Sequence, residues 1–506
     1  MKHNVLDYLE ESALRFPNKT AFADESAACT FAQLKERAQT IGSALAREVP
    51  AGMPVPIFME KSVDTIALFL GCVYAGCFYC LLDVKQPSAR IHTILETLQA
   101  SVAVTVPSHL NTFQNAGFSG RTILLEELEQ QQADRALLQA VRERMTDTSP
   151  LYCNFTSGST GVPKGVVVSH RSVLDFIDVF TDLFSITQED VIGNQAPWDF
   201  DVSVKDIYSG LKTGACVQII PRRMFSFPVQ LLDFLCERHV TTLIWAVSAL
   251  CMISGLKGFE YRVPDSVQKV LFSGEVMPIR HLTLWQQHLP DARFVNLYGP
   301  TEITCNCTYY EVDRTFFPGE SLPIGKPFPN EHVFLLDGQD REITDANITG
   351  ELCVAGTCLA LGYYNNAAQT AKVFTDNPLC PQYPERIYRT GDLAYYGEDG
   401  LLYFASRKDF QIKHMGHRIE LGEVEAALES LPGMERACCL FDERRNKLSA
   451  FCRTALGKRE ITRGLAQILP PFMIPNQFFF MEDFPLNKNG KIDRQKLKND
   501  YLEVDL

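Results

Sequence analysis

Residues 152–170 read Tyr-Cys-Asn-Phe-Thr-Ser-Gly-Ser-Thr-Gly-Val-Pro-Lys-Gly-Val-Val-Val-Ser-His, an apolar segment followed by a Ser/Thr/Gly loop and a valine run. Glycines let a backbone approach an anion closely, while hydroxyls and a lysine supply hydrogen bonds and charge. This lysine follows a proline and precedes a predicted strand, whereas a P-loop lysine lies beside a magnesium-binding hydroxyl. Two interpretations stay open at this point, a polyphosphate-binding loop and a flexible hairpin loop. The candidate phosphate-binding residues are Thr156, Ser157, Gly158, Ser159, Thr160, Gly161 and Lys164.

The length and charge of the chain narrow its class. With 506 residues it exceeds what one hydrophobic core usually supports, so two or more folding units are expected. Its 48 basic and 61 acidic residues give a net charge of −13 without a Lys/Arg-rich block, which argues against nucleic-acid binding. The 16 cysteines are scattered, many of them in apolar runs, as expected for reduced thiols. The N-terminus lacks the apolar core of a signal peptide, so we predict a cytoplasmic location.

The segment from Ile66 to Leu82 is apolar enough to raise the question of a membrane span. Gly71 and Gly76 divide it, and its last five residues are typical of a buried strand that follows a helix. Two core elements fit this pattern better than one span, so no membrane partner is predicted.

The secondary-structure pattern changes twice along the chain. Residues 30–300 alternate helical stretches with short apolar strands, which indicates α/β layers with largely parallel sheets. Residues 323–404 carry closely spaced strands with Gly and Asp turns, typical of a barrel-like β unit. Beyond Arg407 the pattern indicates a small α+β domain. We therefore predict an α/β fold with a large N-terminal domain, residues 1–408, and a small C-terminal domain, residues 409–506.

Five further motifs follow the first loop in order along the chain. Together with that loop they resemble the core motifs of the adenylate-forming superfamily, and most closely the amino-acid-activating adenylation domains of nonribosomal peptide synthetases. The resemblance runs from Cys29 to Leu497 and so covers nearly the whole chain. The motifs are Asn296-Leu-Tyr-Gly-Pro-Thr-Glu302, Gly350-Glu-Leu-Cys-Val-Ala-Gly356, Tyr388-Arg-Thr-Gly-Asp392, residues 407–420 and Asn489-Gly-Lys-Ile-Asp-Arg494.

The resemblance implies a role for each motif in joining a substrate carboxylate to the ATP α-phosphate. Two anions must meet in this reaction, and Lys491 is the implied cation between them. Thr301 and Glu302 would contact the α-phosphate and Mg²⁺, with Glu302 as the metal ligand. Taken singly, each of these residues could instead have a purely structural role, because Glu302 could cap a helix and Lys491 could be a solvated lysine. The further implied ATP-binding residues are Gly274, Glu275, Asn296, Tyr298, Gly299, Asp392 and Arg407, with Asp392 on the ribose hydroxyls.

In the family the small C-terminal domain adopts two orientations, one for adenylation and one for thioester formation. Asp409 occupies the matching hinge position, and Lys413 and Gly416 would line a tunnel for a phosphopantetheine arm. No carrier-type serine motif is found, so the expected partner is a separate phosphopantetheinylated carrier protein. This transfer needs no protein nucleophile, so no catalytic cysteine is predicted.

The resemblance also implies an amino-acid pocket, in which Asp201 would bind the α-ammonium group. Lys205 departs from the apolar or aromatic residue that many relatives carry there, and a buried ammonium needs a partner. Two interpretations stay open: Lys205 pairs with Asp201 one helical turn away, or it contacts a polar substrate side chain. The bulk of Trp245 argues against a large substrate. The implied pocket residues are Asp201, Val202, Lys205, Trp245, Leu271, Ser273, Leu297, Cys305 and Asn306.

Other activities compete with amino-acid loading of a carrier. Several segments and the overall length also resemble the freestanding D-alanine:carrier-protein ligases of teichoic acid metabolism, although Lys205 and Trp245 depart from the small apolar lining expected for alanine. A coenzyme A ligase for an aryl or aliphatic acid is disfavoured by Asp201. A degenerate, non-catalytic member is disfavoured by intact Lys164, Glu302, Asp392 and Lys491.

Overall fold

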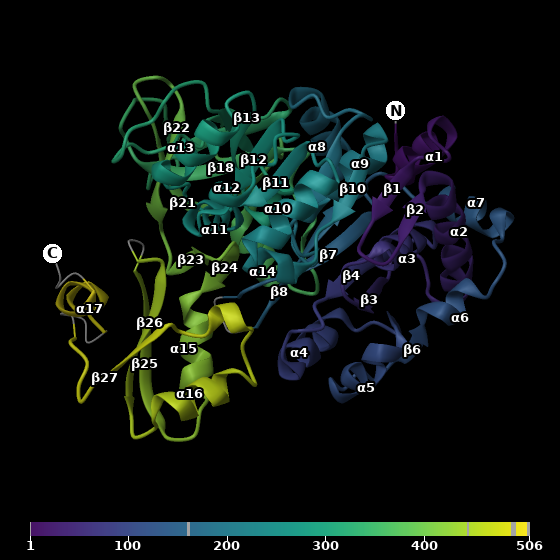
Figure 1. Ribbon diagram of the computed structural model, residues 1–506. Helices are drawn as coiled ribbons and strands as arrows, with labels where there is room; N and C mark the ends of the chain where they lie inside the picture. The colour runs from purple at the N-terminus through teal and green to yellow at the C-terminus, as the bar shows by residue number, and fades with distance from the viewer. Residues whose placement is uncertain (1, 159–161, 443–444, 487–491, 503–506) are drawn as a thin grey trace.

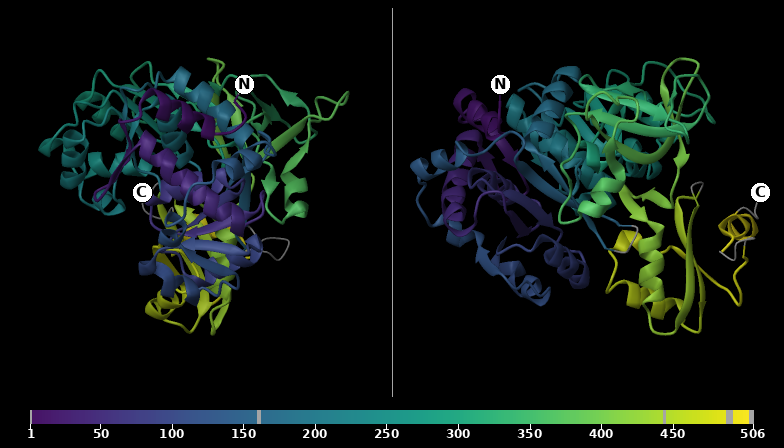
Figure 2. Two further views of the ribbon diagram at one scale, coloured as in Figure 1. Left: turned by 90° about the vertical axis from the view of Figure 1, so that its right-hand side faces the viewer. Right: turned by 180° about the vertical axis from the view of Figure 1, so that it is seen from behind.

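The computed structural model describes residues 2–158, 162–442, 445–486 and 492–502 of the chain (Figure 1). It is a mixed α/β structure with a large N-terminal part and a small C-terminal part, as the sequence predicts. Figure 2 shows the C-terminal elements as a separate body packed against one side of the large part. The domain boundary at residue 409 stays a prediction.

A nine-stranded sheet forms one half of the large part. Its inner strands β13, β12, β11, β9, β10 and β1 are parallel, while β2, β14 and β15 are antiparallel additions at the two edges. In sheet order the strands are β15 (Lys326–Pro327), β14 (Thr308–Glu311), β13 (Arg293–Tyr298), β12 (Lys269–Ser273), β11 (Thr242–Ala246), β9 (Val191–Asn194), β10 (Cys216–Ile219), β1 (Thr20–Ala23) and β2 (Ala28–Thr30).

A seven-stranded sheet forms the other half. Strands β7, β4, β3, β5 and β6 are parallel, and β8 turns back antiparallel to β7 across the Ser/Thr/Gly loop. In sheet order the strands are β19 (Gly362–Tyr363), β8 (Lys164–Ser169), β7 (Pro150–Thr156), β4 (Phe78–Leu82), β3 (Pro54–Phe58), β5 (Val102–Thr105) and β6 (Arg121–Leu124).

The two sheets share one hydrophobic core, because the largest cluster of buried side chains draws on both. Helices α1, α2, α3, α8 and α9 pack against one another in this core, and the hydroxyls of Tyr79 and Tyr208 meet at 2.9 Å between β4 and α9. A second cluster packs α10 to α13 on the nine-stranded sheet. These helices are α1 (Leu6–Arg15), α2 (Phe31–Glu48), α3 (Val63–Tyr74), α8 (His170–Leu183), α9 (Ser203–Thr213), α10 (Pro228–Glu237), α11 (Val247–Gly255), α12 (Gly258–Tyr261) and α13 (Ile279–His288).

The segment from Ile66 to Leu82 contains the two predicted core elements, the end of helix α3 and strand β4. Every residue of β4 is buried, which explains why the whole segment is apolar. Among the residues that the structure describes, no helix is long and apolar enough to span a membrane. The peripheral helices are α4 (Ser88–Leu98), α5 (Pro107–Asn115), α6 (Leu125–Glu129), α7 (Arg135–Arg142) and α14 (Ala367–Val373).

The predicted barrel-like unit corresponds to a six-stranded antiparallel sheet, in which β22 adds to the second half of the long strand β21. It leads directly into the C-terminal part, which has its own hydrophobic cluster drawn from residues 412–478. The sheet consists of β17 (Glu342–Ile343), β16 (Glu331–Leu336), β18 (Gly350–Gly356), β21 (Arg386–Tyr396), β20 (Phe374–Asp376) and β22 (Leu402–Arg407).

The C-terminal part begins with a β-hairpin that reaches toward the large part. Helix α15 follows, and a three-stranded sheet packs against it. Helix α17 lies on the far side of this sheet from the large part (Figure 1). The elements are β23 (Gln411–His414), β24 (His417–Glu420), α15 (Leu421–Glu429), β25 (Met434–Asp442), β26 (Lys447–Thr454), α16 (Lys458–Leu465), β27 (Gln477–Phe480) and α17 (Arg494–Tyr501).

Candidate active site

One cavity lies where the carboxyl ends of the parallel strands of the nine-stranded sheet meet the hairpin β23–β24. Ligands of open α/β sheets bind at this end of the strands, because loops and helix starts converge there. Residues from both parts of the molecule therefore face the same space. The lining includes the predicted site residues Thr156, Ser157, Asp201, Val202, Ser273, Gly274, Gly299, Thr301, Cys305, Asn306, Asp392, Arg407, Lys413 and Gly416.

The Ser/Thr/Gly loop begins at the end of β7, and Thr156 pairs with Lys164 at the start of β8. A side chain at Gly158 would have its Cβ 2.0 Å from the carbonyl oxygen of Val162, so only glycine fits this turn. The backbone N–H of Gly158 and the hydroxyl of Ser157 each donate a hydrogen bond to the C-terminal part. The predicted Ser159, Thr160 and Gly161 lie outside the described residues.

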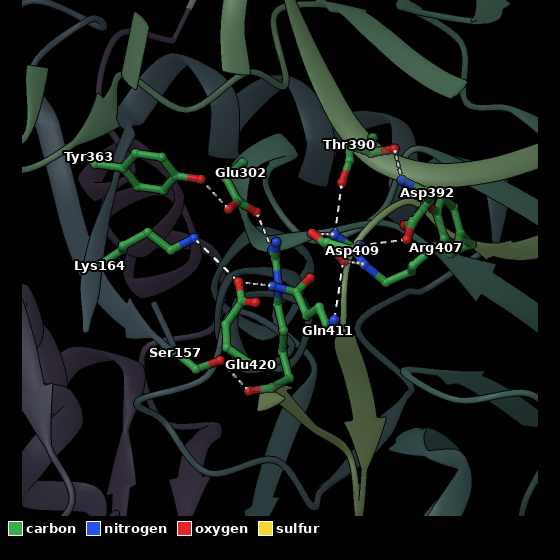
Figure 3. A network of polar contacts seen from close by, with 12 residues as sticks. Ser157, Lys164, Glu302, Tyr363, Thr390, Asp392, Arg407, Asp409, Gln411 and Glu420 are labelled. Carbon is green, nitrogen blue, oxygen red and sulfur yellow. Dashed lines mark hydrogen bonds and ion pairs between the residues drawn. The ribbon is translucent and has the colours of Figure 1, made fainter. Parts of the chain in front are cut away.

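Three acceptors of the C-terminal part contact this loop and the lysine that follows it. The Ser157 hydroxyl donates to the carbonyl oxygen of Arg418 at 2.8 Å, and Gly158 N–H donates to Glu423 at 3.2 Å. Lys164 lies 3.7 Å from a carboxylate oxygen of Glu420, and both side chains are buried (Figure 3). Glu423 also pairs with Arg90 of α4. Donors suited to an anion are thus held by acceptors of the protein itself.

Glu302 is a fully buried carboxylate in a 3₁₀ turn after β13. It accepts hydrogen bonds from the hydroxyl of Tyr363 at 2.7 Å and from Arg418 at 2.8 Å. Burial alone would raise the pKa of Glu302, but Arg418, Lys164 and the Tyr363 hydroxyl outweigh it and lower the pKa to about 2. The carboxylate is therefore ionised at any working pH and available as a hard oxygen ligand.

Arg407 links the predicted ribose carboxylate to the predicted hinge. Its guanidinium donates to Asp392 and, through two nitrogens at 2.6 and 2.8 Å, to both oxygens of Asp409 (Figure 3). Tyr298 donates its hydroxyl to the other oxygen of Asp392. The ammonium of Lys413 lies 5.4 Å from the centre of the Tyr298 ring, so the hairpin closes over the same group of side chains.

The implied amino-acid pocket is divided between the cavity wall and the residues behind it. Asp201 lies in the turn before α9, and burial raises its pKa against the opposing effects of the Thr301 hydroxyl and Lys205. Lys205 is fully buried and donates to Asn306 at 2.7 Å, and its ammonium lies 3.5 Å from the Ser273 hydroxyl. Of the two interpretations left open by the sequence, an ion pair of Lys205 with Asp201 is not observed, because the hydrogen-bond partners found for this ammonium among the described residues are Asn306 and Ser273.

Three of the implied pocket residues are buried in the core and do not line the cavity. Leu271 and Leu297 belong to the core that the two sheets share. Trp245 packs in the cluster on the other face of the nine-stranded sheet, where its indole N–H donates to the Gly193 carbonyl oxygen at 2.7 Å. These three residues belong to the strands that carry the pocket, but their side chains are not among those that line the cavity.

Two other predicted residues have structural partners. Glu275 accepts a hydrogen bond at 3.2 Å from the backbone N–H of Gly416, which fixes the hairpin tip against the large part. Asn296 donates to the Pro323 carbonyl oxygen at 2.7 Å.

Sequence reasoning did not assign roles to Arg90, Arg418, Glu420, Glu423 and Tyr363, although they hold the site residues in place. Arg418 and Glu420 stand in the quoted motif 407–420, so their charges were visible. Their partners were not visible, because the contacts join distant segments: Arg418 is 261 residues from Ser157 and 116 residues from Glu302 along the chain. Arg90 and Tyr363 carry no local sequence signal of this kind.

The predicted catalytic Lys491 lies outside the described residues. The described segment that follows it, α17, packs on the outer side of the C-terminal sheet, where Arg494 stacks 4.2 Å above the Phe410 ring (Figure 1). The face of the C-terminal part that meets the cavity is instead the hairpin β23–β24.

Comparison with known proteins identifies this arrangement. The fold matches an artificially fused adenylation–PCP di-domain, NpsA-ThdA from Klebsiella oxytoca, with a TM-score of 0.80 at 22% identity over 94% of this chain and 93% of that one. At this level of identity the likeness concerns the fold. The model of the AMP-binding enzyme family matches residues 9–364. The chain belongs to the AMP-binding enzyme family.

Two relatives differ in how much of their own length this chain spans. Tyrocidine synthase 1 from Brevibacillus parabrevis is 31% identical over 98% of this chain, which spans only 45% of that protein. Zwittermicin A synthase ZmaJ from Bacillus cereus is 32% identical over 96% of this chain, which spans 93% of that protein. The same unit therefore occurs both inside long synthases and as most of a shorter protein.

Proposed function

We propose that this chain uses ATP to activate an amino acid as an aminoacyl-adenylate, releasing pyrophosphate, and then transfers the aminoacyl group to the phosphopantetheine thiol of a carrier protein. The observation that carries the proposal is the cavity itself, which Asp201, Thr301 and Asp392 line from one side and Lys413 and Gly416 from the other. One space that serves two half-reactions in turn requires such a shared lining.

In the first half-reaction the protein would bind and orient two anions. Ser157, Gly158 and Lys164 would hold the leaving pyrophosphate, and Asp392 would accept hydrogen bonds from the ribose hydroxyls. Lys491 would lie between the substrate carboxylate and the α-phosphate, where it offsets their repulsion. Asp201 would bind the α-ammonium. No protein nucleophile is needed.

A magnesium ion fits the donors at Glu302. Mg²⁺ typically takes one or two carboxylates and completes its shell with phosphate oxygens and water. Glu302 is buried and ionised. The described residues contain no group of three or more His, Cys, Asp or Glu placed to hold a metal, so the protein would supply few ligands beyond Glu302. When bound, the ion would neutralise charge on the phosphates. Arg418 occupies Glu302 in the present orientation.

The orientation of the C-terminal part suits the second half-reaction. The hairpin faces the cavity, while α17 lies on the outer side, so a turn at Asp409 would be needed to exchange these two faces. Lys413 and Gly416 would then line the path of the phosphopantetheine arm. Neither the pocket nor the relatives favour the D-alanine ligase alternative.

The proposed function is tested by pyrophosphate exchange across a panel of the proteinogenic amino acids, read as isotope that enters ATP. Exchange with at least one amino acid, followed by its transfer to the thiol of pantetheine, is the expected result. An enzyme that gives no exchange with any amino acid but forms product from an aryl acid and coenzyme A would be an acyl-coenzyme A ligase instead.

A further prediction concerns the carboxylates that contact the phosphate-binding groups. Glu420 pairs with Lys164 in the present orientation, so it competes with pyrophosphate for the same ammonium. Glu420→Gln weakens this competition because an amide carries no charge. We expect pyrophosphate to inhibit aminoacyl transfer from a supplied adenylate to pantetheine at a concentration roughly 3- to 10-fold lower than in the wild type.

Glu435→Gln is the matched control, because Glu435 is a largely exposed carboxylate of the same part that pairs with Arg453. Its inhibition by pyrophosphate is expected to equal that of the wild type. Equal sensitivity of the Glu420 and Glu435 variants would show that Glu420 does not compete with pyrophosphate.

A further inference from the structure

Lys205 carries a charge that its surroundings do not explain. It lies in the first turn of α9 and is completely buried, and its two oxygen partners, Asn306 and Ser273, are both neutral. Burying an ammonium without a carboxylate partner is costly, and proteins usually pair such a group. A ligand bound in the cavity could supply the missing negative partner of this ammonium.

Lys205 fixes the orientation of Asn306. An ammonium group can only donate hydrogen bonds, so the amide must turn its oxygen toward Lys205, and the 2.7 Å contact is to Oδ1. The amide nitrogen, with its two N–H donors, then points elsewhere. Asn306 and Ser273 both line the cavity, whereas Lys205 lies directly behind them. This end of the cavity presents N–H and O–H groups with a positive charge at their back, which favours a hydrogen-bond acceptor.

The charge balance of the site points to an anionic acceptor. Asp201 and Lys205 have opposite charges and are four residues apart, and Lys205 lowers the pKa of Asp201 at long range. Behind them, Lys61 and Asp206 both contact Asn194, and Lys205 also lowers the pKa of Asp206 at long range, so two buried carboxylates and two buried ammonium groups balance one another here. A free α-amino acid carries an α-carboxylate that balances its α-ammonium, but this balance is lost once the carboxylate is joined to AMP, which leaves one positive charge at Asp201. A negative group beside Lys205 would restore neutrality.

The spacing of the two charges limits the substrate. Asp201 lies in the hydrogen-bonded turn that leads into α9, and Lys205 lies in the first turn of α9, so the two residues are about one turn apart. Residues one turn apart on a helix have Cβ atoms about 5–6 Å apart. An amine bound at one and an acceptor bound near the other are therefore separated by a short carbon chain. A side chain of one or two methylene groups ending in a carboxylate matches this spacing.

We propose that the substrate is a short acidic α-amino acid, whose side-chain carboxylate accepts hydrogen bonds from Asn306 and Ser273. Lys205 is the positioning residue, because it turns the Asn306 amide toward the substrate and supplies the balancing charge. This inference rests on the proposed function and names the substrate class of the same site.

Pyrophosphate exchange with aspartate, glutamate, asparagine, serine and alanine tests the inference. Aspartate or glutamate is expected to give the highest kcat/KM in the wild type. Lys205→Met, which replaces the ammonium with an unbranched apolar chain, is expected to lower kcat/KM for the acidic substrate on the order of 100-fold, mainly through KM. Exchange with asparagine should change only a few-fold. Lys205→Arg should recover part of the acidic preference, which a purely structural role would not predict.

A second variant keeps the test independent of folding. Asn306→Asp gives Lys205 an internal carboxylate partner and leaves the core intact, so it is expected to abolish the preference for acidic substrates. A wild type that exchanges only with neutral amino acids, with a preference that Lys205→Met leaves unchanged, would overturn this inference and leave the proposed function standing. Absence of exchange with every amino acid would overturn the proposed function itself.

Discussion

Lys491→Ala is expected to reduce pyrophosphate exchange by roughly 100- to 1,000-fold, the loss typical when one group that stabilises a developing charge is removed. Transfer of the aminoacyl group from a supplied adenylate to pantetheine is expected to stay near the wild-type rate. The two steps separate because the helix after Lys491 lies on the outer side of the C-terminal part while the hairpin β23–β24 faces the cavity. The measurement compares both half-reactions in the same preparation.

Lys496→Ala serves as the matched control for this variant. Lys496 is an exposed lysine on helix α17, close to Lys491 in the chain, so its removal changes the net charge by the same amount. Both half-reactions of the control should match those of the wild type. If Lys491→Ala slowed both steps equally, the assignment of this lysine to adenylation alone would be wrong.

Asp201→Asn is expected to lower kcat/KM for the amino acid by roughly 30- to 1,000-fold, because truncating one partner of a buried charge pair leaves the other unpaired. The KM for ATP should change little, since the residues proposed to bind the nucleotide, among them Asp392 and Glu302, are unchanged in this variant. The analogue of the amino acid that lacks the α-amine provides a second measurement, because it cannot form the proposed contact with Asp201. Its disadvantage relative to the amino acid, measured by exchange, should shrink in the variant.

Asp182→Asn is the control for the loss of a carboxylate, because Asp182 is mostly exposed and pairs with Lys212 away from the cavity. Its kinetics should equal those of the wild type. An Asp201 variant that penalises the amino acid and its amine-free analogue to the same extent would assign Asp201 a structural role.

The fold class could be predicted from the sequence because the hydrophobic pattern of each element is local. The buried strand β4 and the preceding helix α3 show this, since Gly76 separates the two elements within an otherwise continuous apolar segment. Gly71, which the sequence also offered as a divider, lies inside α3. The antiparallel sheet of β16, β17, β18, β20, β21 and β22 follows from the same kind of signal, closely spaced strands between turns.

The contacts of the site could not be predicted to the same extent, because they depend on how distant segments meet. The sequence left two partners open for Lys205, Asp201 and the substrate. Asp201 was a reasonable partner because residues four apart on a helix lie on the same face. In the structure Lys205 instead donates a hydrogen bond to Asn306, which is 101 residues away in the chain. Trp245 shows the same limit, because strand alternation decides which face its side chain takes.

The double contact of Arg407 connects two events that otherwise look independent. One guanidinium holds Asp392, on the strand beside the ribose position, and also both carboxylate oxygens of Asp409 at the turn between the two parts. The rotation proposed at Asp409 would have to break the two charge-assisted hydrogen bonds between Arg407 and Asp409, which would leave Arg407 to Asp392. If the proposed function holds, release of the nucleotide and rotation of the C-terminal part would both change the contacts of Arg407, so this one cation would couple the order of the two half-reactions.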